Sequence, residues 1–246
     1  MLKAFCFFII VYGYILRINK VLLRFHMNNK KFFITSYMIF WLIWFLIQTI
    51  LYSYILKNDF FPNSYGFIIN FLIKGVVWSS LGLILLFRFR QQLKLPINKL
   101  FNRNFPLPFW IILFAIIIYL LGSAYLYSHG LSIIKHPFTV NGSQFLGITI
   151  GAGVFEELVF RGGYMNILLT KLTTWKANFI QMLMFLLIHL PIYFVTPMNI
   201  LGWVNNIATV SILGLVFGWI FARTKNLWPS IIIHCVWDTL TFLFLF

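Results

Sequence analysis

Acidic side chains are scarce in this sequence: only four of its 246 residues are Asp or Glu, against 19 Lys and Arg. Charged residues of either sign make up 9% of the chain, too few to cover the surface of a soluble domain of this length. A water-soluble globular fold is therefore excluded. Three of the acids, Glu156, Glu157 and Asp238, lie inside strongly apolar stretches, where ionisable groups are functional candidates first.

Cysteine is equally rare, with Cys6 and Cys235 on separate apolar segments. No CxxC pair or cysteine-rich tract is present, which argues against a disulfide framework and against a thiolate metal site. Internal repeats are absent too, as are the inverted pairs of interrupted helices that mark many transporters. Both cysteines are interpreted as small buried apolar residues.

Long apolar runs dominate the rest of the chain, which is 61% hydrophobic with a mean hydropathy of +0.92. Runs of about 20 apolar residues cross a bilayer core as helices. We therefore predict an all-α, polytopic bundle of seven to eight transmembrane helices. The eighth candidate, Ala4 to Leu16, is only about 13 residues long and fits a short span, an interfacial helix or a signal-like segment. The seven predicted spans are 32–56, 65–87, 107–127, 144–169, 178–195, 200–221 and 228–246.

The basic residues separate by loop, as expected when cytoplasmic loops collect Lys and Arg. Only Lys57 and Lys135 fall on the other side. This bias places residues 17–31 in the cytoplasm and the C-terminus outside, and anionic lipid headgroups are favoured over nucleic acid as the charged partner. The cytoplasmic set is Arg17, Lys20, Arg24, Lys30, Lys31, Arg88, Arg90, Lys94, Lys99, Arg103, Lys171, Lys176, Arg223 and Lys225.

One polar, proline-containing segment, from Arg88 to Pro108, divides the chain. We predict an N-terminal apolar and basic segment at 1–31, accessory helices with a basic loop at 32–106, and a transmembrane core at 107–246 that holds the intramembrane acids. Lys74 is the exceptional charge in the accessory helices. Its long stem allows it to reach an interface or the bundle interior, and a structural role is favoured.

The first group of ionisable residues in the core is the segment Glu156-Glu157-Leu-Val-Phe-Arg161. Residues four apart share a helix face, so Glu157 and Arg161 are predicted to form an ion pair that lowers the cost of burying both charges. Glu156 points about 100° away and is left without that partner. A buried carboxylate of this kind suits a general base.

Two further apolar helices carry polar groups. His189 lies just before Pro191, while His234 and Asp238 lie four residues apart and so share one face. Their depths from the cytoplasmic end are broadly similar to that of Glu156. Two histidines with carboxylates leave open a divalent metal such as zinc, held by Glu156, His189, His234 and Asp238.

In this order the three motifs resemble the CAAX-protease and bacteriocin-processing family of intramembrane proteases, also called the Abi family. The resemblance covers roughly residues 107 to 246 and rests on Glu-Glu-x-x-x-Arg at 156–161, Phe-x-x-x-His at 185–189 and His-x-x-x-Asp at 234–238. It implies peptide-bond hydrolysis by water activated by Glu156 and His189, with an oxyanion stabilised by His234 and Asp238. Members are described as metallo- or glutamate-type enzymes, and Asp238 stands where the family often has Asn.

The implied substrate is a peptide or protein, such as a peptide precursor or a CAAX-like protein, or the activity serves bacteriocin self-immunity. The composition, rich in Phe, Ile and Lys, is typical of an AT-rich bacterial genome, so we expect a bacterial plasma membrane, with the site open to the cytoplasm. Two other functions stay open: a non-catalytic immunity or partner-binding membrane protein, and an ion-coupled transporter that uses the same groups as a relay.

Overall fold

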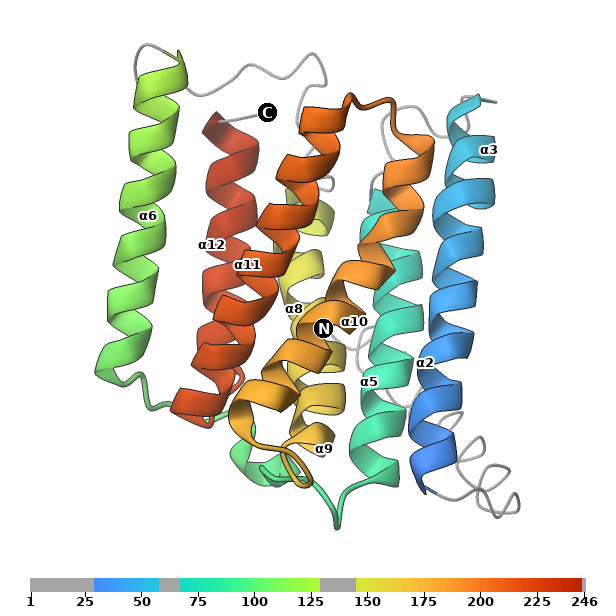
Figure 1. The fold of residues 1–246 in the computed structure, drawn as a ribbon, viewed down its shortest axis with the longest axis vertical. Coiled ribbons are helices and arrows are strands. Elements are labelled where there is room, and N and C mark those ends of the chain that lie inside the picture. Colours follow the sequence, from blue (N-terminus) through green and yellow to red (C-terminus); the bar gives the residue numbers. More distant parts are fainter. Residues whose placement is uncertain (1–28, 58–66, 129–144, 245–246) are drawn as a thin grey trace, which may run out of the picture.

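In the part of the chain that the structure describes, seven continuous helices run up and down through the bundle and there is no strand (Figure 1). The computed structural model describes residues 29–57, 67–128 and 145–244. The apolar run Ala4–Leu16, with Cys6, lies outside them. The elements are α2 (Asn29–Leu46), η1 (Ile47–Leu51) and α3 (Tyr52–Lys57); η2 (Ile68–Ile73) and α5 (Lys74–Arg88); η3 (Ile97–Lys99); α6 (Leu107–Ser128); η4 (Leu146–Gly151), α8 (Ala152–Glu157), η5 (Leu158–Met165) and α9 (Asn166–Leu168); α10 (Thr174–Val195); α11 (Ile200–Thr224); and α12 (Trp228–Phe244).

Five of the helices are long and apolar enough to cross a membrane: Asn29–Tyr54, Ile68–Arg88, Leu107–Leu126, Thr174–Val195 and Ile200–Thr224. They confirm an all-α bundle and the corresponding five predicted spans, as expected of an integral membrane protein. Of the other two predicted spans, 144–169 and 228–246, the described residues 145–168 and 228–244 are helical as well, but neither helix is among these five. One is the helix that carries Glu156, Glu157 and Arg161, and the other is the 17-residue α12.

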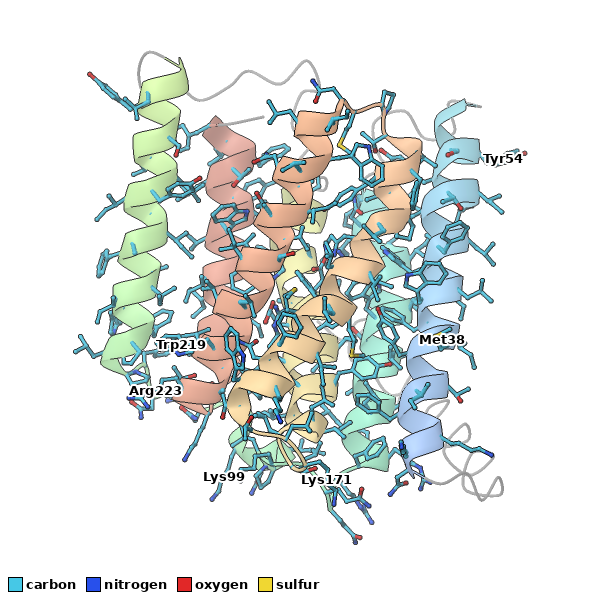
Figure 2. All side chains as sticks on the ribbon, viewed as in Figure 1. Met38, Tyr54, Lys99, Lys171, Trp219 and Arg223 are labelled. Atoms are coloured by element: carbon cyan, nitrogen blue, oxygen red, sulfur yellow. The ribbon has the colours of Figure 1, made fainter. Side chains whose placement is uncertain are left out.

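The exterior of the bundle is apolar. Met38 and Trp219 point outward and are 59% and 43% exposed (Figure 2). Such a surface is unfavourable in water and suits contact with lipid chains. Lys99, Lys171 and Arg223 lie together at one end of the bundle, and Tyr54 lies toward the other (Figure 2).

The helix formed by η4, α8, η5 and α9 lies in the middle of the bundle and packs against α5, α10 and α12. Its close contact with α12 depends on Gly153: a Cβ atom there would fall 2.5 Å from Sγ of Cys235 and 3.1 Å from the Cys235 backbone nitrogen. Only glycine permits this approach. Directly after Glu157 the α-helix gives way to the π-helical segment η5, a change often found at functional sites.

A network of asparagines fixes the ends of two site-bearing helices. Asn226, fully buried, accepts from the Trp228 amide at 3.1 Å and donates to the carbonyl oxygens of Asn102 and Asn104 at 3.0 and 2.9 Å. Asn166 in α9 pairs with both backbone groups of Leu95, at 2.7 and 2.9 Å. The polar segment between α5 and α6 thus ties the end of the Glu156 helix to the start of α12.

Candidate active site

The predicted site residues come from three separate helices and meet in one place. Glu156 and Glu157 lie in α8, His189 in α10, and His234 and Asp238 in α12. The Nε2 atom of His189 lies 3.8 Å from Oε2 of Glu156, and the Nε2 atom of His234 lies 4.0 Å from the same oxygen. The convergence predicted from similar depths therefore exists.

The predicted ion pair between Glu157 and Arg161 is present, with Nη1 of Arg161 2.8 Å from Oε1 of Glu157. Both side chains are fully buried. Arg161 also donates to the Gly214 carbonyl oxygen at 3.1 Å, and its guanidinium lies over the rings of Phe185 and Phe217, at 4.5 and 5.3 Å from their centres. Charge pairing, a hydrogen bond and cation–π contact together offset the cost of burying the arginine.

Glu156 does have a cationic partner, which corrects the expectation that it stands alone. Nζ of Lys74 donates to Oε1 of Glu156 and forms a buried ion pair with it. Helical spacing indicates only partners on the same helix, whereas Lys74 lies 82 residues away on α5. The sequence feature that pointed to this contact is a single Lys in an otherwise apolar helix. Of the two positions expected for its side chain, the interface and the bundle interior, the structure shows the bundle interior.

The hydrogen bonds of His189 fix its tautomer. Its Nδ1 lies 2.7 Å from the Phe185 carbonyl oxygen, and because a carbonyl only accepts, Nδ1 must carry a proton. The Nε2 atom of the neutral ring is then a lone-pair acceptor facing Glu156. The ring also packs on Phe185, with centroids 4.6 Å apart.

His234 is held by a contact that the sequence analysis missed. Its Nδ1 donates to Oε1 of Glu157 at 2.9 Å, the same oxygen that accepts from Arg161. Its ring stacks on Phe217, with centroids 4.6 Å apart and planes at 27°. The predicted proximity of His234 and Asp238 is present, with Nε2 3.5 Å from Oδ2.

One carboxylate oxygen at the centre of this cluster, Oε2 of Glu156, lacks a hydrogen-bond partner among the described residues. Oε2 of Glu156 is buried and makes no hydrogen bond within the described part of the chain, although two imidazole nitrogens face it. A buried carboxylate oxygen left unpaired is costly, so its position calls for a ligand. A water molecule able to bridge polar atoms about 4 Å apart is the simplest one.

A divalent metal fits this arrangement poorly. Two histidines and carboxylates are ligand types that zinc accepts, but nowhere in residues 29–57, 67–128 and 145–244 do three or more His, Cys, Asp or Glu side chains form a group able to hold one. The nearest positive charge to Glu156 is instead the Lys74 ammonium.

Comparison with known proteins gives a match for the part of the chain that carries most of these site residues. Residues 138–240 match the family described as "Type II CAAX prenyl endopeptidase Rce1-like", a shorter stretch than the predicted 107–246. Neither the curated proteins nor the solved structures gave a match. The matched residues include Glu156, Glu157, His189, His234 and Asp238, whereas Lys74 lies outside them. Residues 138–240 are therefore similar to the Rce1-like type II CAAX prenyl endopeptidases, a family of proteases.

Proposed function

We propose that this protein is an intramembrane endopeptidase that hydrolyses a peptide bond with a water molecule activated by Glu156 and His189. The observation that carries the proposal is the free, buried Oε2 of Glu156 between two imidazole nitrogens. A base must lie within hydrogen-bonding reach of the proton that it removes. A water bound between Oε2 of Glu156 and Nε2 of His189 satisfies that requirement.

The tautomer of His189 determines how this water is oriented. Both Oε2 of Glu156 and Nε2 of neutral His189 accept hydrogen bonds, so the water donates one hydrogen to each. Its lone pairs are then free to attack a carbonyl carbon. Glu156 takes the water proton as the oxygen–carbon bond forms, and it returns that proton to the leaving amine when the carbon–nitrogen bond breaks.

His234 and Asp238 serve the oxyanion of the tetrahedral intermediate. Because Nδ1 of His234 donates to Glu157, only a doubly protonated His234 offers a second N–H, at Nε2. Glu157 and Asp238 flank the ring and balance this positive charge. A preorganised donor aimed at developing negative charge is the form of stabilisation that such an intermediate needs.

The orientation follows from the charge distribution. We place the end of the bundle that bears Lys99, Lys171 and Arg223 in the cytoplasm and the C-terminus outside, with water reaching the site from the cytoplasmic side, in a bacterial plasma membrane. Single cysteines at Lys57 and Lys171, in a chain with Cys6 and Cys235 replaced by serine, test this. A membrane-impermeant maleimide is expected to label position 57 in intact cells and position 171 only after the cells are opened.

The substrate class is a peptide or protein with a segment in the membrane, such as a peptide precursor. The test is quantitative peptide mass spectrometry of membranes and medium from cells that carry wild-type protein, Glu156→Gln or His189→Phe at matched expression. A peptide whose uncleaved form accumulates in both variants is expected. Equal peptide profiles, with a deletion phenotype rescued equally by all three forms, would point instead to a non-catalytic immunity or partner-binding role.

A further inference from the structure

Lys74 contacts Glu156 directly but lies outside the family-matched segment, residues 138–240. It is the first residue of α5, directly after the π-helical segment Ile68–Ile73. Its side chain is 8% exposed, and its Nζ donates a hydrogen bond to Oε1 of Glu156 but not to Oε2. The motifs that define the site do not include it.

The surroundings of Lys74 hold its ammonium in a narrow space. Nζ lies over the ring of Trp78, 4.8 Å from its centre, and 5.8 Å from that of Trp44. Both tryptophans are buried, at 1% and 4% exposure. The ammonium is therefore held by cation–π attraction to the two rings and by its ion pair with the Glu156 carboxylate, which together favour one position for Nζ.

The backbone beside Lys74 is equally constrained. Gly75 lies against Phe155, where an added Cβ would be 3.0 Å from the ring, so α5 and α8 approach closely at the level of the ion pair. Lys74 and Glu156 are thus presented to each other by two helices that cannot separate without losing this packing.

From this geometry we infer that Lys74 is a positioning residue for the base: its ammonium keeps Glu156 ionised and holds Oε1, so that Oε2 faces His189 and His234. The inference rests on the proposed function and adds a component from the N-terminal helices to the site. A carboxylate in a low-dielectric interior persists only beside a compensating charge. Lys74, His189 and His234 face Glu156, and among the described residues Lys74 is the one of these three that donates a hydrogen bond to its carboxylate.

A spectroscopic experiment tests the ionisation directly and needs no substrate. Infrared difference spectra of protein in lipid vesicles are recorded for wild type minus Glu156→Gln, and for Lys74→Met minus the double variant Lys74→Met/Glu156→Gln. The wild-type difference is expected to show a carboxylate band, and the Lys74→Met difference a protonated carboxyl band. A carboxylate band of equal intensity in both differences would overturn the inference, because a merely structural lysine leaves Glu156 ionised.

Turnover supplies the second test, with the peptide that accumulates in Glu156→Gln membranes as the probe. Lys74→Met is expected to lower kcat by roughly a hundredfold, the scale of a lost general base, with little change in KM. Lys74→Arg, which keeps the charge, is expected to recover part of the loss. Lys171→Met, the same replacement at an exposed position, serves as the matched control and is expected to leave kcat unchanged.

The two proposals fail in distinguishable ways. Full kcat in Lys74→Met together with an inactive Glu156→Gln overturns the role of Lys74 and leaves the protease intact. Cleavage that is unaffected by Glu156→Gln overturns the proposed function itself. If Lys74→Met is poorly folded, Lys74→Arg decides: wild-type thermal stability with a kcat as low as that of Glu156→Gln would contradict a role that depends on charge.

Discussion

Nδ1 of His234 and Nη1 of Arg161 converge on one atom, Oε1 of Glu157, at 2.9 and 2.8 Å. The second acidic residue of the Glu-Glu pair is therefore the group that orients His234, besides being the counter-ion of Arg161. A ring fixed through Nδ1 presents Nε2 in one direction. Glu156 and Glu157, adjacent in sequence, thus have different roles in the same site: Oε2 of Glu156 faces His189, and Oε1 of Glu157 binds His234.

Replacing Glu157 with Gln should lower turnover without removing any proposed catalytic group. The amide oxygen still accepts one hydrogen bond, but the negative charge that balances a doubly protonated His234 is lost. We expect kcat to fall by roughly ten- to a hundredfold, since the oxyanion donor is weakened rather than deleted. Steady-state cleavage of the accumulating peptide measures it, and wild-type kcat in this variant would show that the Glu157–His234 contact has no part in the reaction.

Arg161→Ala should destabilise the fold as well as the site. It leaves the buried Glu157 carboxylate without its arginine counter-ion, and it removes the hydrogen bond to Gly214. Breaking one side of a buried ion pair costs about 3–5 kcal/mol. Denaturant unfolding of detergent-solubilised protein, followed by tryptophan fluorescence, measures this loss. Arg223→Ala, at an exposed position near the end of α11, is the control and should change the unfolding free energy by less than about 0.5 kcal/mol.

The Lys74–Glu156 pair should show strong coupling in a double-mutant cycle. Glu156→Gln leaves the Lys74 ammonium buried without its counter-ion, whereas Lys74→Met removes the cation and leaves Glu156 to bind a proton. Each single variant should lower the unfolding free energy by about 3 kcal/mol. The double variant removes both charges, so its loss should be smaller than the sum of the two single losses. Additive losses would mean that the two groups do not interact in the folded protein.

His189→Phe should separate activity from stability. The histidine side chain is 24% exposed, and a phenyl ring can keep the contact with Phe185. We expect turnover to fall to background while the unfolding free energy changes by no more than about 1 kcal/mol. Cleavage and unfolding are measured on the same preparation, and residual activity near that of wild type would remove His189 from the mechanism.

Gly153→Ala should separate α8 from α12. The added methyl group would meet Sγ of Cys235 at 2.5 Å and its backbone nitrogen at 3.1 Å, so one helix must shift. We expect a loss of about 1–3 kcal/mol in stability and reduced turnover, because His234 adjoins Cys235. Gly122→Ala in α6 is the matched control, since nothing lies within 4 Å of its Cβ position, and it should be neutral or slightly stabilising.

The sequence by itself determined much of this protein. Apolar length and the 3.6-residue period fixed the helices, because a chain in lipid must satisfy its backbone hydrogen bonds internally. The Glu157–Arg161 pair and the shared face of His234 and Asp238 were predictable, since i,i+4 neighbours on a helix meet whatever the tertiary fold.

Contacts between helices were decided only by the tertiary structure. The partner of Glu156 is Lys74, from a helix that carries none of the motifs, and the ring of His234 is oriented by Glu157 rather than by Asp238 alone. Periodicity specifies which residues share a face of one helix, but it does not specify which faces of different helices meet. That choice depends on side-chain packing, such as the approach of α8 to α12 at Gly153, and packing is a property of the assembled bundle.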